Sequence, residues 1–125
     1  MPIRAVWTMS KTDKKALGKL GEDQAVEYLI AFGYAILERN WRFGQKEIDI
    51  LAQLANVLVV VEVKSSLLDN WNDGRDRITP LQEESLRIAA LEYLEQNTWE
   101  MEIRFDLILV QPSNPKNIRH IKSVF

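Results

Sequence analysis

The chain has 125 residues, of which 46% are hydrophobic and 27% are charged, and its formal net charge is −2. This balance is typical of one soluble domain, and no apolar run approaches the roughly 20 residues that a membrane span needs. The absence of cysteine and the single histidine exclude disulfide scaffolds, thiolate metal sites, cysteine nucleophiles and most zinc sites. Carboxylates and lysines remain as candidate catalytic groups, and we expect a cytoplasmic domain without a membrane partner.

Basic residues concentrate at the two ends of the chain. Residues 1–20 carry a net charge of +4 and residues 111–125 carry +3, so the residues between them carry −9. Such ends are typical of arms that contact a polyanion, and solvated termini are an equal alternative. We expect residues 1–15 to form a basic N-terminal extension and residues 16–125 to form a single domain.

The first half of the chain predicts one helix and three strands. Apolar residues at helical spacing predict a helix at about 16–32, and Gly33 marks its C-terminal end. Three segments with alternating or β-branched residues predict strands, at 34–41, 46–52 and 57–64.

The second half predicts a further helix and strand. This helix runs from Thr79 to about Gln96, with Thr79 as the N-cap, Pro80 at the first position and Gln82 completing a capping box. The remaining predicted elements are a polar loop at 65–78, a strand at 102–110 and a short strand near 117–123. The order of elements predicts an α/β domain in which a mixed sheet is flanked by helices.

The most informative segment is the predicted hairpin of strands 46–52 and 57–64. A symmetric turn about Ala55 and Asn56 places Asp49 opposite Glu62. Because side chains alternate along a strand, one face then carries Glu47, Asp49, Glu62 and Lys64, with Glu47 opposite Lys64. The other face carries Ile48, Ile50, Val61 and Val63.

Two opposed carboxylates destabilise a sheet unless something compensates their charge. A divalent cation between Asp49 and Glu62 would do so, and Lys64 would orient a water or offset charge on a reacting oxygen, which suits phosphodiester hydrolysis. The alternative is a solvent-facing strand in which Glu47 and Lys64 form a cross-strand ion pair. The almost wholly apolar run around Glu62 favours burial, where a lone carboxylate needs a partner, but a one-residue slip would separate Asp49 from Glu62.

The ordered motifs resemble a known family. They are LGKLGEDQAVEYL at 17–29, LERNWR at 37–42, EIDILA at 47–52, VVVEVKS at 59–65, ITPLQ at 78–82, AALEYL at 89–94 and RFDLILV at 104–110. This order resembles the PD-(D/E)XK nuclease superfamily, with its restriction-endonuclease-like αβββαβ core. It is more closely similar to the YraN-type family of small bacterial proteins, which is related to Holliday-junction resolvases.

The resemblance implies a site and a substrate. Asp49 and Glu62 would bind a catalytic Mg²⁺ or Mn²⁺, Lys64 would assist the attacking water, and the carbonyl of Val63 and the carboxylate of Glu22 would be further metal ligands. Glu22 is equally explained as a first-turn acid favoured by the helix dipole. The implied partner is nucleic acid, namely branched or single-stranded DNA, with Lys46, Arg75 and Arg77 as candidate contacts and a homodimer as a further option.

Departures from the family pattern keep three functions open. This chain has Lys46, Ser66 and Gln82 where many relatives have glycine, arginine and a basic residue. The hypotheses are a metal-dependent nuclease, a catalytically silent nucleic-acid-binding module, and a protein–protein scaffold that docks through an acidic helix face (Glu83, Glu84, Glu92 and Glu95).

Four further residues receive structural interpretations. We interpret Arg104 and Asp106 as a structural ion pair, Trp71 as a side chain packed at the sheet edge, and His120 as an exposed residue without a special role.

Overall fold

The computed structural model describes residues 10–66 and 77–125. Its elements are α2 (Lys11–Ala31), β1 (Ala35–Phe43), β2 (Lys46–Leu54), β3 (Val57–Ser65), α3 (Pro80–Asn97), β4 (Glu102–Val110) and β5 (Ile118–Ile121). The strands form one sheet in the order β1-β2-β3-β4-β5, in which β3 and β4 are parallel and the other neighbours are antiparallel. The predicted α/β class and αβββαβ order are confirmed, and the architecture is consistent with a restriction-endonuclease-like core.

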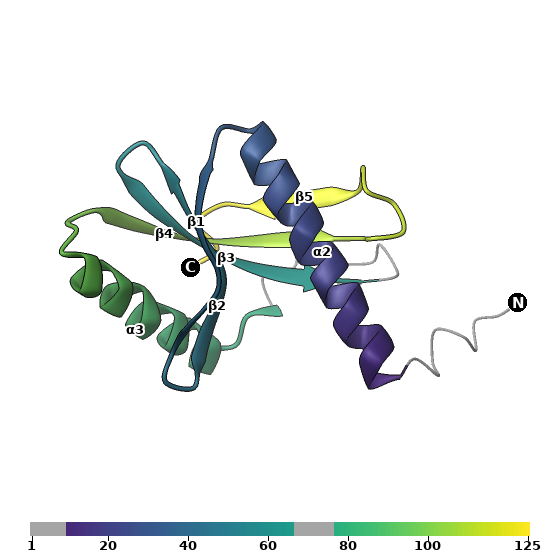
Figure 1. The fold of residues 1–125 in the computed structure, drawn as a ribbon, viewed down its shortest axis with the longest axis horizontal. Helices are drawn as coiled ribbons and strands as arrows, with labels where there is room; N and C mark the ends of the chain where they lie inside the picture. Colours follow the sequence, from purple (N-terminus) through teal and green to yellow (C-terminus); the bar gives the residue numbers. More distant parts are fainter. Residues whose placement is uncertain (1–9, 67–76) are drawn as a thin grey trace, which may run out of the picture.

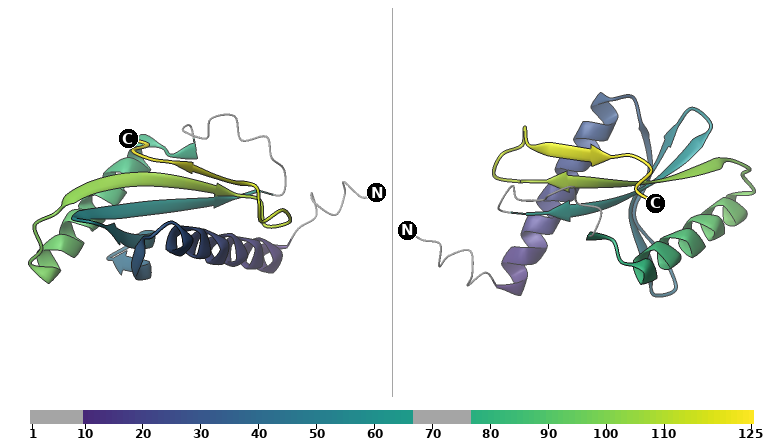
Figure 2. Two further views of the ribbon diagram at one scale, coloured as in Figure 1. Left: turned by 90° about the horizontal axis from the view of Figure 1, so that it is seen from above. Right: turned by 180° about the vertical axis from the view of Figure 1, so that it is seen from behind.

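The two helices cover opposite faces of the sheet. Helix α2 crosses the parallel pair β3 and β4, whereas α3 lies beside the β1–β2 hairpin (Figure 1 and Figure 2). Alternate residues of β3 accordingly enter two separate cores: Val59 and Val61 pack with α2, and Leu58 and Val60 pack with α3. Within the described ranges, neither helix combines the length and the apolar composition needed to cross a membrane.

Both helices begin with a capped first turn. Helix α2 begins at Lys11, five residues before the predicted start, because Ser10 and Asp13 form a reciprocal capping box. Residues 11–15, assigned above to the extension, are therefore helical. Thr79 caps α3 as predicted, by accepting the backbone N–H of Gln82 at 3.1 Å. The second contact of the predicted capping box, between the Gln82 side chain and the Thr79 backbone N–H, is wrong. The Gln82 side chain bonds instead to Glu62 of β3.

The β2–β3 hairpin has the predicted register. Its pairs run from Leu54 with Val57 to Ile50 with Val61, on either side of a turn in which Ala55 has a φ of +52°. The prediction of two uniform faces is wrong, because Ile50 packs with α2 but Ile48 packs with α3.

This change of face coincides with an irregular position in β1. Asn40 has a left-handed φ of +52°, and the β1–β2 ladder passes from Arg39 with Ile50 directly to Trp41 with Ile48. A left-handed residue within a strand breaks the regular alternation of faces. The outer end of the hairpin is thereby turned relative to the rest of the sheet.

A close approach of α2 to the sheet depends on Gly21. A Cβ at this position would lie 2.6 Å from Val110 Cγ2, and closer still to Ser65 Oγ. The missing side chain therefore sets the depth at which the helix packs on β3 and β4.

Candidate active site

Asp49 lies in β2 at a position that is paired neither with β1 nor with β3. The paired positions between β2 and β3 end at Ile50 and Val61, one residue before Asp49. The Asp49 side chain reaches β3 instead, where its Oδ2 accepts the backbone N–H of Val63 at 2.9 Å. The carboxylate is thus held in the space between the two diverging strands.

Glu62 is buried, with 7% of its surface exposed, and its carboxylate has two partners. Lys64 Nζ lies 3.1 Å from Glu62 Oε2, and Gln82 Nε2 of α3 donates to the same oxygen at 2.5 Å. The expected pairing of Lys64 with Glu47 is wrong, because Glu47 lies 3.0 Å from Arg42 of β1. The turned end of the hairpin carries Glu47 away from the predicted shared face.

The electrostatic state of Asp49 is set by burial and by Glu62. Burial, the negative charge of Glu62 and a hydrogen bond with Glu62 raise the pKa of Asp49 to about 8, although the Val63 N–H acts in the opposite direction. With this raised pKa, Asp49 retains its proton at neutral pH when no cation is bound. The two side chains interact directly, although the paired positions of β2 and β3 end one pair before Asp49 and Glu62.

A pocket of about 360 Å³ opens beside Asp49. It is lined by Lys14, Leu17, Gly18, Glu22, Asp49, Val63, Lys64 and Ser65. The pocket combines carboxylate oxygens with a lysine ammonium, and oxygen ligands of this kind suit hard cations such as Mg²⁺. Within the described part of the chain, no three carboxylate or histidine groups are already assembled as a metal cluster.

Glu22 enters this pocket from the middle of α2. Asn40 Nδ2 donates to Glu22 Oε1 at 2.9 Å, and Arg39 lies 3.5 Å from the same oxygen. The interpretation of Glu22 as a first-turn acid is wrong, because α2 begins eleven residues earlier, at Lys11.

The predicted nucleic-acid contacts are not assembled at this pocket. Neither Lys46, at the start of β2, nor Arg77, just before α3, belongs to its lining. Arg75 and Trp71 lie outside the described residues. The basic residues near the carboxylates are instead Lys64 of β3, Lys14 of α2 and Arg39 of β1.

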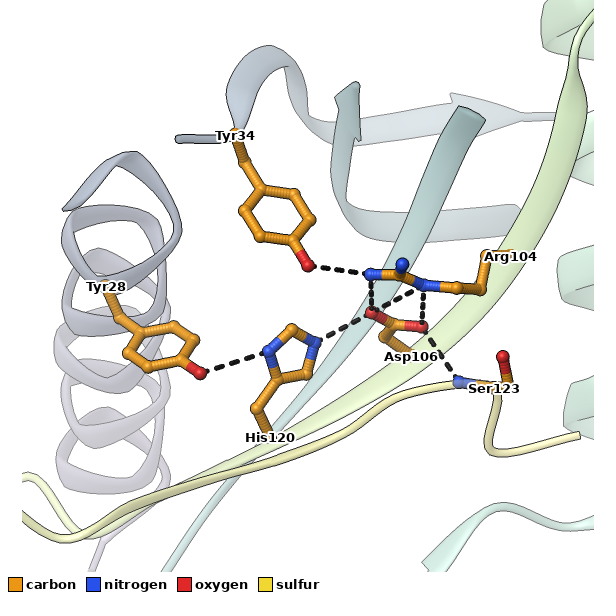
Figure 3. Close-up of polar contacts among 6 residues, drawn as sticks. All are labelled: Tyr28, Tyr34, Arg104, Asp106, His120 and Ser123. Carbon is orange, nitrogen blue, oxygen red and sulfur yellow. Dashed lines mark hydrogen bonds and ion pairs between the residues drawn. The ribbon is translucent and has the colours of Figure 1, made fainter. Parts of the chain in front are cut away.

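A second polar cluster, none of whose residues lines the pocket, is only partly predicted from the sequence (Figure 3). Arg104 forms the predicted ion pair with Asp106, at 2.8 Å. His120 is not exposed as expected: its side chain is 5% exposed, and its Nε2 lies 2.7 Å from Asp106 Oδ2. Tyr28 of α2 contacts His120 Nδ1 at 3.2 Å, and Arg104 donates to Tyr34 at 2.7 Å.

This cluster fixes the C-terminal strand to the body of the domain. Burial alone would raise the pKa of Asp106, but hydrogen bonds from His120, Arg104 and the Ser123 backbone hold that pKa below its ordinary value. The side chain of Asp106 is completely buried. The sequence signal for such a cluster is Asp106 itself, a carboxylate directly before the apolar run at 107–110, because a buried charge needs partners.

Comparison with known proteins gives a consistent family assignment. Residues 21–110 match the uncharacterised protein family UPF0102. A UPF0102 protein of Flavobacterium psychrophilum is 43% identical over 110 residues, which cover 87% of this chain and 92% of the relative. A second, from Phocaeicola vulgatus, is 38% identical over 86% of this chain and 90% of the relative. A third, from a Sulfurihydrogenibium species, is 36% identical over 90% of this chain and 96% of the relative.

Proposed function

We propose that this chain, which belongs to the UPF0102 family, is a metal-dependent nuclease that hydrolyses phosphodiester bonds in DNA. The proposal includes placement in the PD-(D/E)XK superfamily, with branched or single-stranded DNA as the substrate. The observation that supports this proposal most strongly is that Asp49 and Glu62 interact directly beside an open pocket, while Lys64 contacts Glu62.

The donor set suits a hard divalent cation. Asp49 and Glu62 would hold Mg²⁺ or Mn²⁺, together with the carbonyl of Val63 and the carboxylate of Glu22, which lines the same pocket. When bound, the cation supplies Lewis-acid polarisation of a phosphoryl oxygen and a lowered pKa for a water molecule. Its charge would also replace the proton that Asp49 otherwise retains.

The surrounding residues hold these groups in place. The Val63 N–H fixes Asp49, and the Gln82 amide fixes Glu62, so neither carboxylate needs to rotate before it binds a cation. The Lys64 side chain is 31% exposed and therefore accessible from solvent. Its ammonium can donate to an attacking water or to a phosphoryl oxygen whose negative charge increases in the transition state.

A cleavage assay tests the proposal. Labelled junction, flap, duplex and single-stranded DNA would be incubated with Mg²⁺ or Mn²⁺ and the wild-type protein, Asp49→Asn or Glu62→Gln. We expect each substitution to lower the cleavage rate by at least about 100-fold, the upper range for disturbing the surroundings of a metal site. The matched control is Glu102→Gln, which neutralises an exposed carboxylate at the start of β4.

The outcomes separate the three hypotheses. Absence of cleavage by the wild-type protein, or undiminished cleavage by Asp49→Asn, would refute the nuclease. Salt-dependent DNA binding without cleavage would support the catalytically silent module. Absence of both binding and cleavage would support the protein–protein scaffold.

A further inference from the structure

A second hollow adjoins the carboxylate pocket along α2. It has a volume of about 560 Å³ and is lined by Lys15, Gly18, Lys19, Glu22, Arg39, Asn40, Arg42 and Glu47. Gly18 and Glu22 line both this hollow and the carboxylate pocket. The two spaces are therefore neighbours on the same side of the domain, between the first half of α2 and the strands.

The combined lining is basic. Six lysine and arginine side chains face three carboxylates, in a chain whose net charge is −2. Lys14 and Lys15 make no ion pair with any residue that the structure describes, and Lys19, with a side chain 74% exposed, has only a 3.7 Å contact with Asp23. This surface thus has the opposite sign to the chain as a whole, which favours a polyanionic ligand.

Ion pairs with Glu22 and Glu47 of the hollow, and with the neighbouring Asp23, hold its two arginine side chains in place. Arg39 lies 2.6 Å from Asp23 and 3.5 Å from Glu22, and Arg42 lies 3.0 Å from Glu47. A guanidinium has five N–H donors, so these contacts leave donors available for a phosphate. The Arg42 side chain is 68% exposed and can meet such a ligand without rearranging the fold.

Gly18 removes the barrier between the two spaces. A Cβ built at this position meets no atom within 4 Å. A side chain there would project into the space shared by the two hollows, whereas glycine leaves the path open. Gly18 differs in this respect from Gly21, whose missing Cβ is required for packing.

We propose that the two hollows form one groove, which binds the sugar–phosphate backbone of a DNA strand next to the bond that is cleaved. The phosphate that reacts occupies the carboxylate pocket, and neighbouring phosphates lie against Lys15, Lys19, Arg39 and Arg42. This inference rests on the proposed nuclease function and assigns its substrate-binding surface. Arginine binds phosphate oxygens in a bidentate manner and lysine acts as a point charge, so the groove contacts the backbone rather than the bases.

DNA binding with cleavage suppressed tests the groove. Fluorescence anisotropy would be measured in EDTA with a labelled strand of about 20 nucleotides, longer than typical single-strand sites. The strand would be used alone and annealed to its complement, and the form that the wild-type protein binds more tightly would serve as the probe. The test variant is Lys15→Gln/Lys19→Gln, and its charge-matched control is Lys116→Gln/Lys122→Gln in the basic C-terminal segment.

We expect the groove variant to bind about tenfold more weakly and to show a reduced salt dependence. Each lost phosphate contact lowers the slope of log K against log salt by about 0.7 for single strands and about 0.9 for a duplex. Two contacts therefore remove about 1.4 to 1.8 from the slope, and the control should match the wild-type protein. Equal losses in the two variants would overturn the groove, as would the absence of DNA binding by the wild-type protein.

A second pair of variants tests the continuity of the path. Gly18→Glu places a carboxylate between the two hollows, whereas Ala31→Glu adds the same charge at an exposed position at the C-terminal end of α2, outside both linings. We expect Gly18→Glu to weaken binding at least tenfold and Ala31→Glu to bind like the wild-type protein. Wild-type affinity in Gly18→Glu would overturn the proposed path.

The failures of the two proposals are distinguishable. If Lys15→Gln/Lys19→Gln selectively loses affinity but no DNA is cleaved in Mg²⁺ or Mn²⁺, the groove stands and the nuclease falls. If Asp49→Asn abolishes cleavage while both lysine variants keep the wild-type salt slope, the nuclease stands and the groove falls.

Discussion

Replacement of Asp49 by asparagine should stabilise the metal-free protein at alkaline pH. The asparagine Oδ1 can accept the Val63 N–H as Asp49 does at 2.9 Å, so the substitution removes the charge and keeps the backbone contact. The carboxyl pKa is raised from 3.8 to about 8 by burial and by Glu62. Below about pH 4 this group is protonated in both the folded and the unfolded protein, and the variant gains nothing there.

Between about pH 4 and pH 8 the unfolded chain releases the Asp49 proton and the folded chain retains it, so the wild-type protein loses stability as the pH rises. The two pKa values convert to at most about 6 kcal/mol at about 1.4 kcal/mol per pKa unit. Water that enters the open pocket and local relaxation reduce this value. We therefore expect Asp49→Asn to gain about 2–3 kcal/mol over the wild-type protein by about pH 9.

Urea unfolding in EDTA, followed by tryptophan fluorescence at several pH values, measures this difference. Repeating the titrations in Mg²⁺ should reverse the order, because a cation at 1,000 times its dissociation constant stabilises the wild-type site by about 4.1 kcal/mol. Glu102→Gln provides the control for loss of one carboxylate. A stability difference between Asp49→Asn and the wild-type protein that stays constant or falls with rising pH would refute the electrostatic account.

Three further predictions concern the fold and are measured by the same unfolding assay. Ala55→Gly should stabilise the protein by about 1 kcal/mol, because a glycine accepts the φ of +52° without the penalty of a Cβ, and an unchanged stability would contradict this. Gly21→Ala should destabilise the protein by about 1–3 kcal/mol, because the added methyl group overpacks the contact between α2 and the sheet. Gly18→Ala, where the methyl group meets open space, should stabilise the protein by up to about 1 kcal/mol. Equal effects of the two substitutions would show that the close approach of α2 is unimportant. Arg104→Leu should cost about 3–5 kcal/mol, because it removes a charged partner from the fully buried Asp106, and a loss below 1 kcal/mol would contradict that dependence.

The sequence predicts the fold well where the information is local. The alternation in β2 and the apolar run in β3 identify the strands, and a symmetric turn at Ala55 and Asn56 is sufficient to predict the register. Thr79 and Pro80 mark the start of α3 for an equally local reason. Glu62 stands out because a single carboxylate in an apolar strand needs a partner, and Lys64 and Gln82 are partners of this kind.

The errors arise where side chains meet over long sequence separations. His120 and Tyr28 are 92 residues apart, so nothing in the C-terminal segment alone indicates that this histidine is buried. The sequence predicts that the Gln82 side-chain oxygen accepts the Thr79 N–H, but the Gln82 amide nitrogen instead donates to a buried carboxylate on β3. A hydrogen bond to a buried charge is stronger than one at a helix terminus that water can reach. Local patterns predict which groups need partners but do not identify those partners.

Asn40 explains both the most important error and the geometry of the site. Its left-handed backbone lies where one pair is missing from the β1–β2 ladder, and Ile48 and Ile50, on either side of that position in β2, pack on opposite faces. The same interruption leaves Asp49 outside both ladders, where its carboxylate bonds to β3 and meets Glu62. The Asn40 side chain also holds Glu22 at the edge of this pocket. Asparagine adopts left-handed conformations more readily than most residues, which lets one position serve as a break in the strand and as a support for an acidic group.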